Sequence, residues 1–148
     1  MSYTSMNYHV VFSTKDRKPF LQAESLDRTC QYIGGLTRNL GGALLTANGQ
    51  ADHVHLAAVI PPKESVSQFV GKVKANSCGW LRQTCGEMSD FRWQDGYAAF
   101  TVSLSAVPQV RSYIDSQAEH HRKMTFEEEL IKLLDRHGIE YDVNSLWA

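Results

Sequence analysis

The stretch ALLTANGQADHVHLAAVI, residues 43–60, decides the fold that this chain is expected to adopt. Its two halves read as short strands, and Asn48-Gly49 are turn-forming residues, so the stretch predicts a β-hairpin. Apolar residues fall on both faces of the second half, residues 53–60. This pattern predicts a central strand that is covered on both sides.

Helices and strands are predicted in alternation on both sides of the hairpin. Residues 24–42 and 65–86 carry apolar side chains at helical spacing. Residues 6–14 and 91–105 are rich in β-branched and aromatic residues and predict the outer strands. The order β-α-β-β-α-β predicts an α+β, ferredoxin-like fold in which a four-stranded antiparallel sheet carries two helices on one face.

Two further helices are predicted after the last strand. VPQVRSYIDSQAEHH, residues 107–121, opens with a proline in its first turn. TFEEELIKLLDRHG, residues 125–138, begins at Thr125, with Glu128 completing a capping box, and stops at Gly138. The predicted fold is therefore α+β with these helices added after the sheet.

Length and composition favour one domain over residues 1–148, with a core of about 6–121 and a helical tail of about 122–148. The chain is 43% hydrophobic and 21% charged, as in ordinary globular proteins. No apolar run approaches the roughly 18–20 residues that cross a bilayer, so no membrane partner is expected. The three cysteines form no CxxC pair, which favours the reducing cytoplasm over an oxidising compartment.

The small net charge of −1 conceals an asymmetry along the chain. Residues 1–86 hold nine Lys and Arg against five Asp and Glu, a net charge of +4. Residues 87–148 hold six against eleven, a net charge of −5. A basic body with an acidic tail is compatible with a phosphate-containing partner, although charge alone does not identify one.

His53 and His55 share one face of the predicted strand, where they are either ordinary polar residues or two ligands of a divalent metal. No third histidine or carboxylate lies at ligand spacing beside this pair. The expected third ligand is Gln117, which shares a helix face with Tyr113 at i, i+4, and His121 is a competing ligand one turn on. Tyr113 is either a nucleophile or a packing residue with its hydroxyl at the rim.

Four segments, in this order, make the sequence recognisable: YHVVFSTKDRKPF near the start, DHVHL, WQDGYAAFTVS and YIDSQ. Together they resemble the single-tyrosine HUH transposases of bacterial insertion sequences and their repeat-associated relatives. HUH denotes two histidines around a bulky apolar residue, which fits His53-Val54-His55. The resemblance covers about residues 6–121, and the tail is not part of the shared motifs.

The resemblance implies an enzyme that cleaves and rejoins single-stranded DNA and recognises imperfect hairpins near element ends. It implies that Tyr113 attacks the scissile phosphate, leaving a 5′-phosphotyrosine link and a free 3′-OH. It also implies a Mg²⁺ or Mn²⁺ ion held by His53, His55 and Gln117. The family works as a homodimer, in which the tyrosine helix of one subunit often docks on the HUH strand of the other. The apolar side chains of the tail, Phe126, Leu130, Ile131, Leu133, Leu134 and Ile139, would suit such an interface.

Five basic residues are candidate phosphate contacts or solvated surface residues: Lys15, Arg17, Lys18, Lys72 and Lys74. An alternative function is a non-catalytic or domesticated nucleic-acid-binding module that stacks bases on its sheet. The sequence has no strand signature that matches the aromatic-rich strands of such modules, and binding alone needs neither the histidine pair nor a nucleophile. A zinc hydrolase or metal-storage protein is a third possibility, opposed by the missing third ligand.

Overall fold

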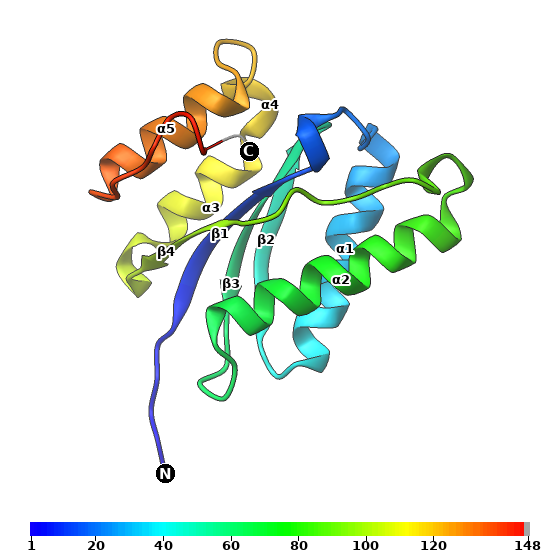
Figure 1. Cartoon of the computed structure of the whole chain (residues 1–148). Coiled ribbons are helices and arrows are strands. Elements are labelled where there is room, and N and C mark those ends of the chain that lie inside the picture. The colour runs from blue at the N-terminus through cyan, green and yellow to red at the C-terminus, as the bar shows by residue number, and fades with distance from the viewer. Residues whose placement is uncertain (147–148) are drawn as a thin grey trace.

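The predicted hairpin is present, and two outer strands extend it into one antiparallel sheet (Figure 1). The structure is a computed structural model that describes residues 1–146. The strands run in the spatial order β2-β3-β1-β4, and their bounds are β1 (Asn7–Ser13), β2 (Ala43–Gln50), β3 (His53–Val59) and β4 (Ala98–Val102). The predicted α+β fold with the βαββαβ order is therefore confirmed.

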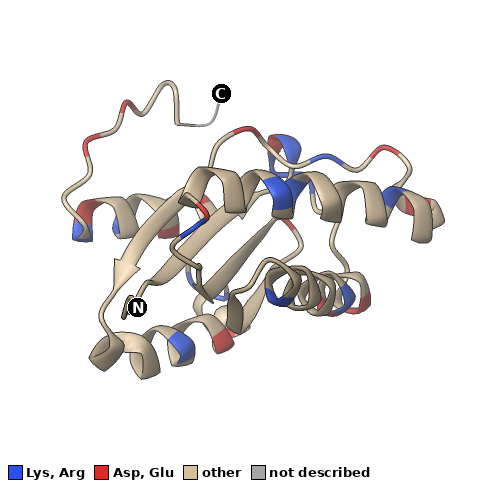
Figure 2. Cartoon of the chain, turned by 90° about the horizontal axis from the view of Figure 1, so that it is seen from below, with Lys and Arg blue, Asp and Glu red and all other residues tan. Residues whose placement is uncertain are grey.

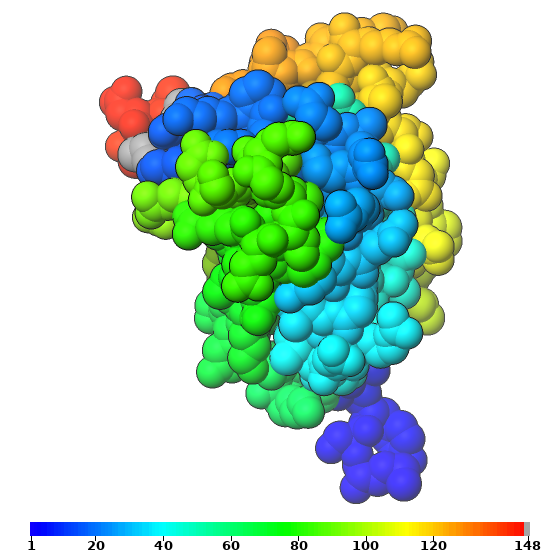
Figure 3. Space-filling model, turned by 90° about the vertical axis from the view of Figure 1, so that its right-hand side faces the viewer, coloured from blue at the N-terminus to red at the C-terminus, as the bar shows by residue number. Residues whose placement is uncertain are grey.

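Two long helices, α1 (Ala23–Asn39) and α2 (Val66–Thr84), cover one face of the sheet and lie side by side (Figures 1 and 3). The capping box at Ser65 starts α2, because its side chain accepts from the Gln68 amide while the Gln68 side chain accepts from the Ser65 amide. The main core lies between these helices and the sheet. It includes Val10, Phe12, Ile33, Val54, Leu56, Ala58, Phe69, Val73 and Leu81.

The opposite face of the sheet is covered by the C-terminal helices (Figure 1). These are α3 (Val107–Asp115), α4 (Gln117–His120) and α5 (Phe126–Arg136). Short 3-10 helices lie elsewhere in the chain: η1 (Lys15–Arg17), η2 (Gly86–Met88) and η3 (Leu104–Ala106). A second core forms between this face and α5, from Val11, Phe100, Phe126, Leu133 and Leu134. The apolar residues of the tail thus pack largely on the chain's own sheet, and the predicted cap at Thr125 is confirmed by its bond from the Glu128 amide.

The turn of the central hairpin lies later than the sequence suggested. It is formed by Ala51 and Asp52, and β2 runs through Asn48-Gly49 without interruption. Gly49 is required there by close approach, since a Cβ atom would lie 2.1 Å from the carbonyl oxygen of His53. Gly49 is therefore needed because the backbone of β2 comes close to β3 at this position. The prediction of a turn at Asn48-Gly49 was wrong.

The fourth strand is shorter than the predicted span 91–105. Only Ala98–Val102 pair as a strand, and Trp93 makes an isolated bridge to Thr14. Gly96 adopts a φ of 86°, which interrupts the extended backbone. The indole N–H of Trp93 donates to Ser77 Oγ at 3.0 Å, so this segment is fixed by side-chain contacts to α2.

The predicted helix 107–121 is broken at Ser116, whose backbone angles are φ −101° and ψ 23°. Side chains of β2 hold the end of α3. The Asn48 amide donates to the carbonyl oxygens of Ile114 (3.1 Å) and Asp115 (3.3 Å), and Thr46 donates to the Asp115 carboxylate at 2.6 Å. The carbonyls at the end of α3 thus find partners on the sheet, and the chain restarts as α4.

Within residues 1–146, no helix combines the length and the apolar character needed to span a bilayer. Figure 2 shows Lys and Arg interspersed with Asp and Glu on several helices.

Candidate functional site

The predicted histidine pair lies at the centre of the sheet. His53 and His55 are 0% exposed and share the face of β3 that meets the C-terminal helices. Their strand pairs with β1 on one side and β2 on the other, so both imidazoles are fixed on a backbone bonded along both edges. The prediction of a central strand covered on both faces is confirmed.

A carboxylate from the tail completes the cluster. Glu129 of α5 is 1% exposed, and its Oε1 atom lies 2.9 Å from Nε2 of His55 and 3.3 Å from Nε2 of His53. Potential ligand atoms of these three residues all lie within 4.8 Å of one another. The expectation that no carboxylate accompanies the pair was wrong, because Glu129 is 74 residues from His55 and arrives only through the fold.

One signal in the sequence could have identified Glu129. It lies three residues after Phe126 and four before Leu133, and these spacings place all three side chains on the same face of α5. Phe126 and Leu133 are buried in the second core. A carboxylate on the apolar face of an amphipathic helix is rarely buried without a partner, so its position marks it as different from the exposed Glu128.

The two carboxylate oxygens of Glu129 serve different partners. Oε1 accepts from His55 and from Nε2 of His121 at 3.0 Å, whereas Oε2 accepts from the Tyr113 hydroxyl and from the Gln117 amide at 3.0 Å. The amide oxygen of the fully buried Gln117 lies 3.0 Å from Nε2 of His53. The structure thus brings Tyr113, Gln117 and His121 together with the pair, as the spacing on residues 107–121 suggested.

The carboxylate and the histidines shift one another's protonation. Burial raises the pKa of Glu129, but the hydrogen bonds from His121, His53 and His55 outweigh burial and hold it well below its usual range. Burial lowers the pKa of His53, but the hydrogen bonds to Asp52 and Glu129 prevail and raise it to about 9. For His55 burial prevails and lowers the pKa to about 4, so this imidazole is neutral.

Tyr113 lies beside the histidine pair and contacts the rings of His9, His55 and His120. Its ring stacks on His120 with centroids 4.5 Å apart, and its hydroxyl donates to Glu129. Burial and the nearby carboxylate raise the pKa of Tyr113 above its ordinary value. His9 of β1 donates from Nε2 to Nδ1 of His55 at 2.8 Å, because the neutral His55 carries its one proton on Nε2, where it is donated to Glu129. Burial lowers the pKa of His9 to about 3.

The donor set fits a divalent metal ion. An ion with bonds of roughly 2.0–2.2 Å spaces neighbouring ligand atoms about 3 Å apart, and Oε1 of Glu129 lies 2.9 and 3.3 Å from the two Nε2 atoms. The other nitrogen of His53 donates to the Asp52 carboxylate at 2.7 Å, which orients the ring as partners of metal-bound histidines do. The buried group of His53, His55 and Glu129 could therefore hold a metal once their shared protons leave.

The basic residues singled out in the sequence fall into two places. Lys15, Arg17 and Lys18 follow β1 at the end where Ser13 pairs with His53, and Arg17 forms an ion pair with Glu127 at 2.6 Å. The lysines of α2 belong to the opposite layer. Lys72 contacts Glu64 at 2.8 Å, and Lys74 donates to the carbonyl oxygens of Gln94 and Gly96.

Comparison with known proteins agrees with this site. The chain is 31% identical over 133 residues to the transposase for insertion sequence element IS200 of Salmonella typhimurium, a match covering 82% of this chain and 84% of the relative. It is 25% identical over 117 residues to the ISDra2 transposase TnpA of Deinococcus radiodurans, covering 76% of this chain and 84% of the relative.

A solved structure shares the fold: a REP-associated tyrosine transposase bound to a REP hairpin. It superposes with a TM-score of 0.60 at 14% identity, covering 82% of this chain and 74% of the other. Residues 2–117 match the family model described as "Transposase IS200 like". This match spans β1 to Gln117 and includes the histidine pair and Tyr113, so the chain belongs to the IS200-like transposase family.

Proposed function

We propose that this DNA transposase cleaves and rejoins single-stranded DNA through a covalent link between Tyr113 and a 5′-phosphate. The observation that carries the proposal is the shared carboxylate: the Tyr113 hydroxyl and the His53–His55 pair contact opposite oxygens of Glu129. A nucleophile and a candidate metal site from three distant parts of the sequence therefore converge within one hydrogen-bond network.

His53, His55 and Glu129 would hold the metal, with the amide oxygen of Gln117 as a further ligand. We infer Mg²⁺ or Mn²⁺, and the ion would polarise the scissile phosphate and stabilise the charge that develops on it. A His₂Glu set also occurs in zinc enzymes. Anomalous scattering from crystals of the purified protein would identify the metal that the site takes up.

The residues of the chain itself have separate roles in this proposal. The Tyr113 hydroxyl oxygen forms a bond to phosphorus while the bond from phosphorus to the 3′ oxygen breaks. Oε2 of Glu129, which already accepts the hydrogen bond from the hydroxyl, orients the attacking oxygen, and the phenol proton passes to solvent. The 3′ oxygen leaves as a hydroxyl after taking a proton from solvent. Rejoining is the reverse attack by a 3′-OH on the phosphotyrosine.

Hairpin DNA is the proposed substrate. A structural neighbour holds a REP hairpin, which supports the same class of ligand here. Lys15, Arg17 and Lys18 lie at the metal-site end of β1, where they would contact the DNA backbone. We do not assign this contact to Lys72 and Lys74, because they lie in the layer on the other side of the sheet and already bind protein partners.

We infer that one chain contains a complete site, since its own Tyr113 faces its own histidine pair. The homodimer expected from the family stays a prediction. The apolar tail no longer supports it, because the tail is largely buried on the chain's own sheet. Light scattering at tens of micromolar gives the oligomeric state. Mixing His55→Ala chains with Tyr113→Phe chains distinguishes a site within one chain from a site that two chains share. Only a shared site, with the histidines of one chain and the tyrosine of the other, would regain activity.

The deciding experiment is an adduct assay. End-labelled single-stranded hairpins from the DNA flanking the gene are incubated with the protein and Mn²⁺ or with a chelator, and covalent products are resolved on denaturing gels. Wild type should give a metal-dependent adduct, and Tyr113→Phe should bind the hairpin without forming one. Tyr141→Phe is the matched control and should react like wild type. An adduct from Tyr113→Phe would show that the nucleophile is elsewhere, whereas binding without any adduct would favour a non-catalytic module.

A further inference from the structure

A cavity of about 310 Å³ opens beside Tyr113 and has no part in the chemistry described above. It lies between the end of β4, the first turns of α3 and the last turns of α5. Its polar and aromatic walls include His9, Ser103, Gln109, Tyr113, Arg136 and His137.

Two wall residues connect this cavity directly to the site. His9 donates to His55 at 2.8 Å, and Tyr113 donates to Glu129. Arg136 lies two helical turns after Glu129 on α5, about 10 Å along the axis. Its positive charge acts on the Tyr113 hydroxyl, opposing the rise in the pKa of Tyr113. A ligand in the cavity would therefore touch the nucleophile's ring and meet a cation.

The walls offer both stacking surfaces and free polar groups. The His137 ring stacks on Phe100 with centroids 4.1 Å apart, and its Nδ1 donates to the carbonyl oxygen of Leu133 at 2.8 Å, so the ring is held in place. Within residues 1–146, the Gln109 side chain makes no hydrogen bond and Arg136 makes no ion pair. Aromatic rings bind base faces, amides bind base edges, and guanidinium groups bind phosphates.

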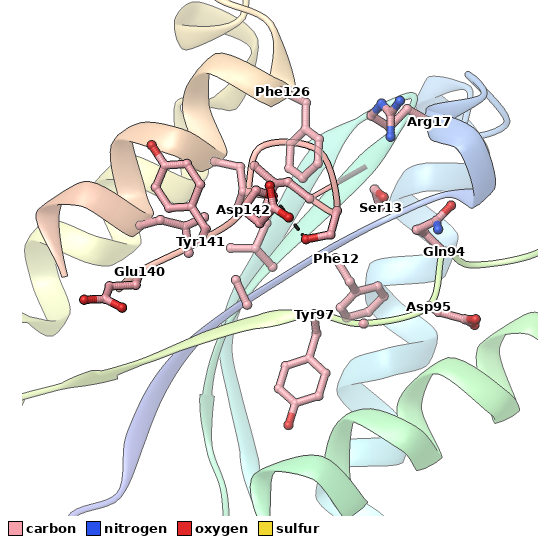
Figure 4. A pocket seen from close by; sticks show the side chains of 17 residues that line it. Phe12, Ser13, Arg17, Gln94, Asp95, Tyr97, Phe126, Glu140, Tyr141 and Asp142 are labelled. Atoms are coloured by element: carbon pink, nitrogen blue, oxygen red, sulfur yellow. Dashed lines mark hydrogen bonds between the residues drawn. The ribbon is translucent and has the colours of Figure 1, made fainter. Parts of the chain in front are cut away.

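The size of the cavity selects among DNA ligands. At roughly 30 Å³ per water, it has the volume of about ten waters, which is enough for one base with its sugar. A larger cavity of about 460 Å³, lined in part by Phe126, has a different character (Figure 4). Among the described residues, its wall carries three carboxylates, Asp95, Glu140 and Asp142, against one cation, Arg17, so it is less suited to a phosphate backbone.

We propose that the cavity beside Tyr113 is the subsite for one unpaired nucleotide of the DNA strand, next to the phosphate that is attacked, with Arg136 contacting the backbone. The inference rests on the proposed function, because it assumes that the strand passes Tyr113. The subsite would let the protein contact the cleaved strand directly, in addition to any contacts with the hairpin.

An abasic scan tests the base in this subsite. Hairpins carrying one abasic nucleotide, at each of several positions on both sides of the cleaved bond, are compared for the rate of adduct formation. Loss of stacking should slow the wild type roughly tenfold at one position adjacent to the bond. Ala106 also lines the cavity. Ala106→Phe, which fills the cavity with a ring, should therefore cleave intact and abasic hairpins at similar rates. Gln109→Ala, at an exposed position, serves as a second variant and should show a reduced preference for the intact base.

The salt dependence of binding tests Arg136 without any chemistry. Hairpin binding by Arg136→Ala is measured by fluorescence anisotropy at several salt concentrations. Loss of one phosphate contact should reduce the slope of log K against log salt by about 0.7. Arg111→Ala removes the same charge from an exposed position of α3 and should leave the slope nearer wild type.

The outcomes separate the two proposals. If wild type forms no adduct with any hairpin, the proposed function fails, and the salt slopes still test the subsite. If adducts form but no position next to the bond is sensitive to base loss, or if the two arginine variants have equal slopes, the nucleotide subsite is refuted while the proposed function stands.

Discussion

Replacing Glu129 by glutamine tests the central feature of the site, because the side chain keeps its shape and loses its charge. This carboxylate contacts three histidines, an amide and a phenol at a position that is 1% exposed. An amide can keep only part of that network. Removing one partner of a buried ion pair costs about 3–5 kcal/mol, and we expect a loss near 3 kcal/mol because one acceptor oxygen remains.

That loss has a measurable consequence in thermal melts. For a chain of this size, about 1 kcal/mol corresponds to roughly 2–4 °C, so Glu129→Gln should melt about 6–12 °C below wild type in a chelating buffer. Adding Mn²⁺ at about one hundred times its Kd should stabilise wild type by about 2.7 kcal/mol. The variant should gain far less from the metal, because it has lost its anionic ligand.

The matched control is Glu128→Gln, which removes the same charge from the preceding, exposed position of α5. It should melt close to wild type and keep the full Mn²⁺ response. The reasoning is refuted if Glu129→Gln melts with wild type in chelator and responds to Mn²⁺ to the same extent. A stability loss with an unchanged metal response would mean that Glu129 supports the fold without binding metal.

Three further predictions concern separate parts of the molecule. His55→Ala should abolish the Mn²⁺-dependent rise in melting temperature, since a ligand is lost, and an unchanged rise would make the histidine pair structural. Asn48→Ala removes both hydrogen bonds to the end of α3, so chemical denaturation should show about 1–2 kcal/mol less stability. Adduct formation should also slow, and an unaltered rate would show that this contact does not position Tyr113. Burial raises the pKa of Cys30 to about 12, which leaves about a thousandfold less thiolate at pH 8 than an ordinary cysteine has. Alkylation of Cys30 by iodoacetamide, measured by peptide mass spectrometry, should therefore be slow until denaturant is added. Equal rates with and without denaturant would contradict this.

Local patterns were sufficient for the sheet and the histidine pair. The period-two alternation of 53–60 placed both imidazoles on one face, and the order of the elements predicted the topology. These features depend on neighbours in the sequence, and a strand's alternation is fixed by its own backbone. The helical spacing on residues 107–121 likewise brought Tyr113 and Gln117 toward the same partner, even though the helix itself is broken.

Features that depend on distant contacts could not be predicted this way. The break at Ser116 is stabilised by Asn48, which is 66 and 67 residues from the carbonyls that it binds. Helical spacing places Glu129, unlike Glu128, on the apolar face of its helix, but it does not show which groups that face meets. Only the docking of α5 on the second face of the sheet brings Glu129 to the histidine pair.

The place of Glu129 in the chain has a consequence for protein synthesis. The ribosome makes the sheet, both covering helices and Tyr113 before it reaches this residue. A nascent chain that has emerged only through α4 carries the histidine pair and the tyrosine without their common carboxylate. The assembled site therefore forms late in translation, and a truncated product ending before α5 would lack the carboxylate of the candidate metal site and the helix that covers Val11 and Phe100.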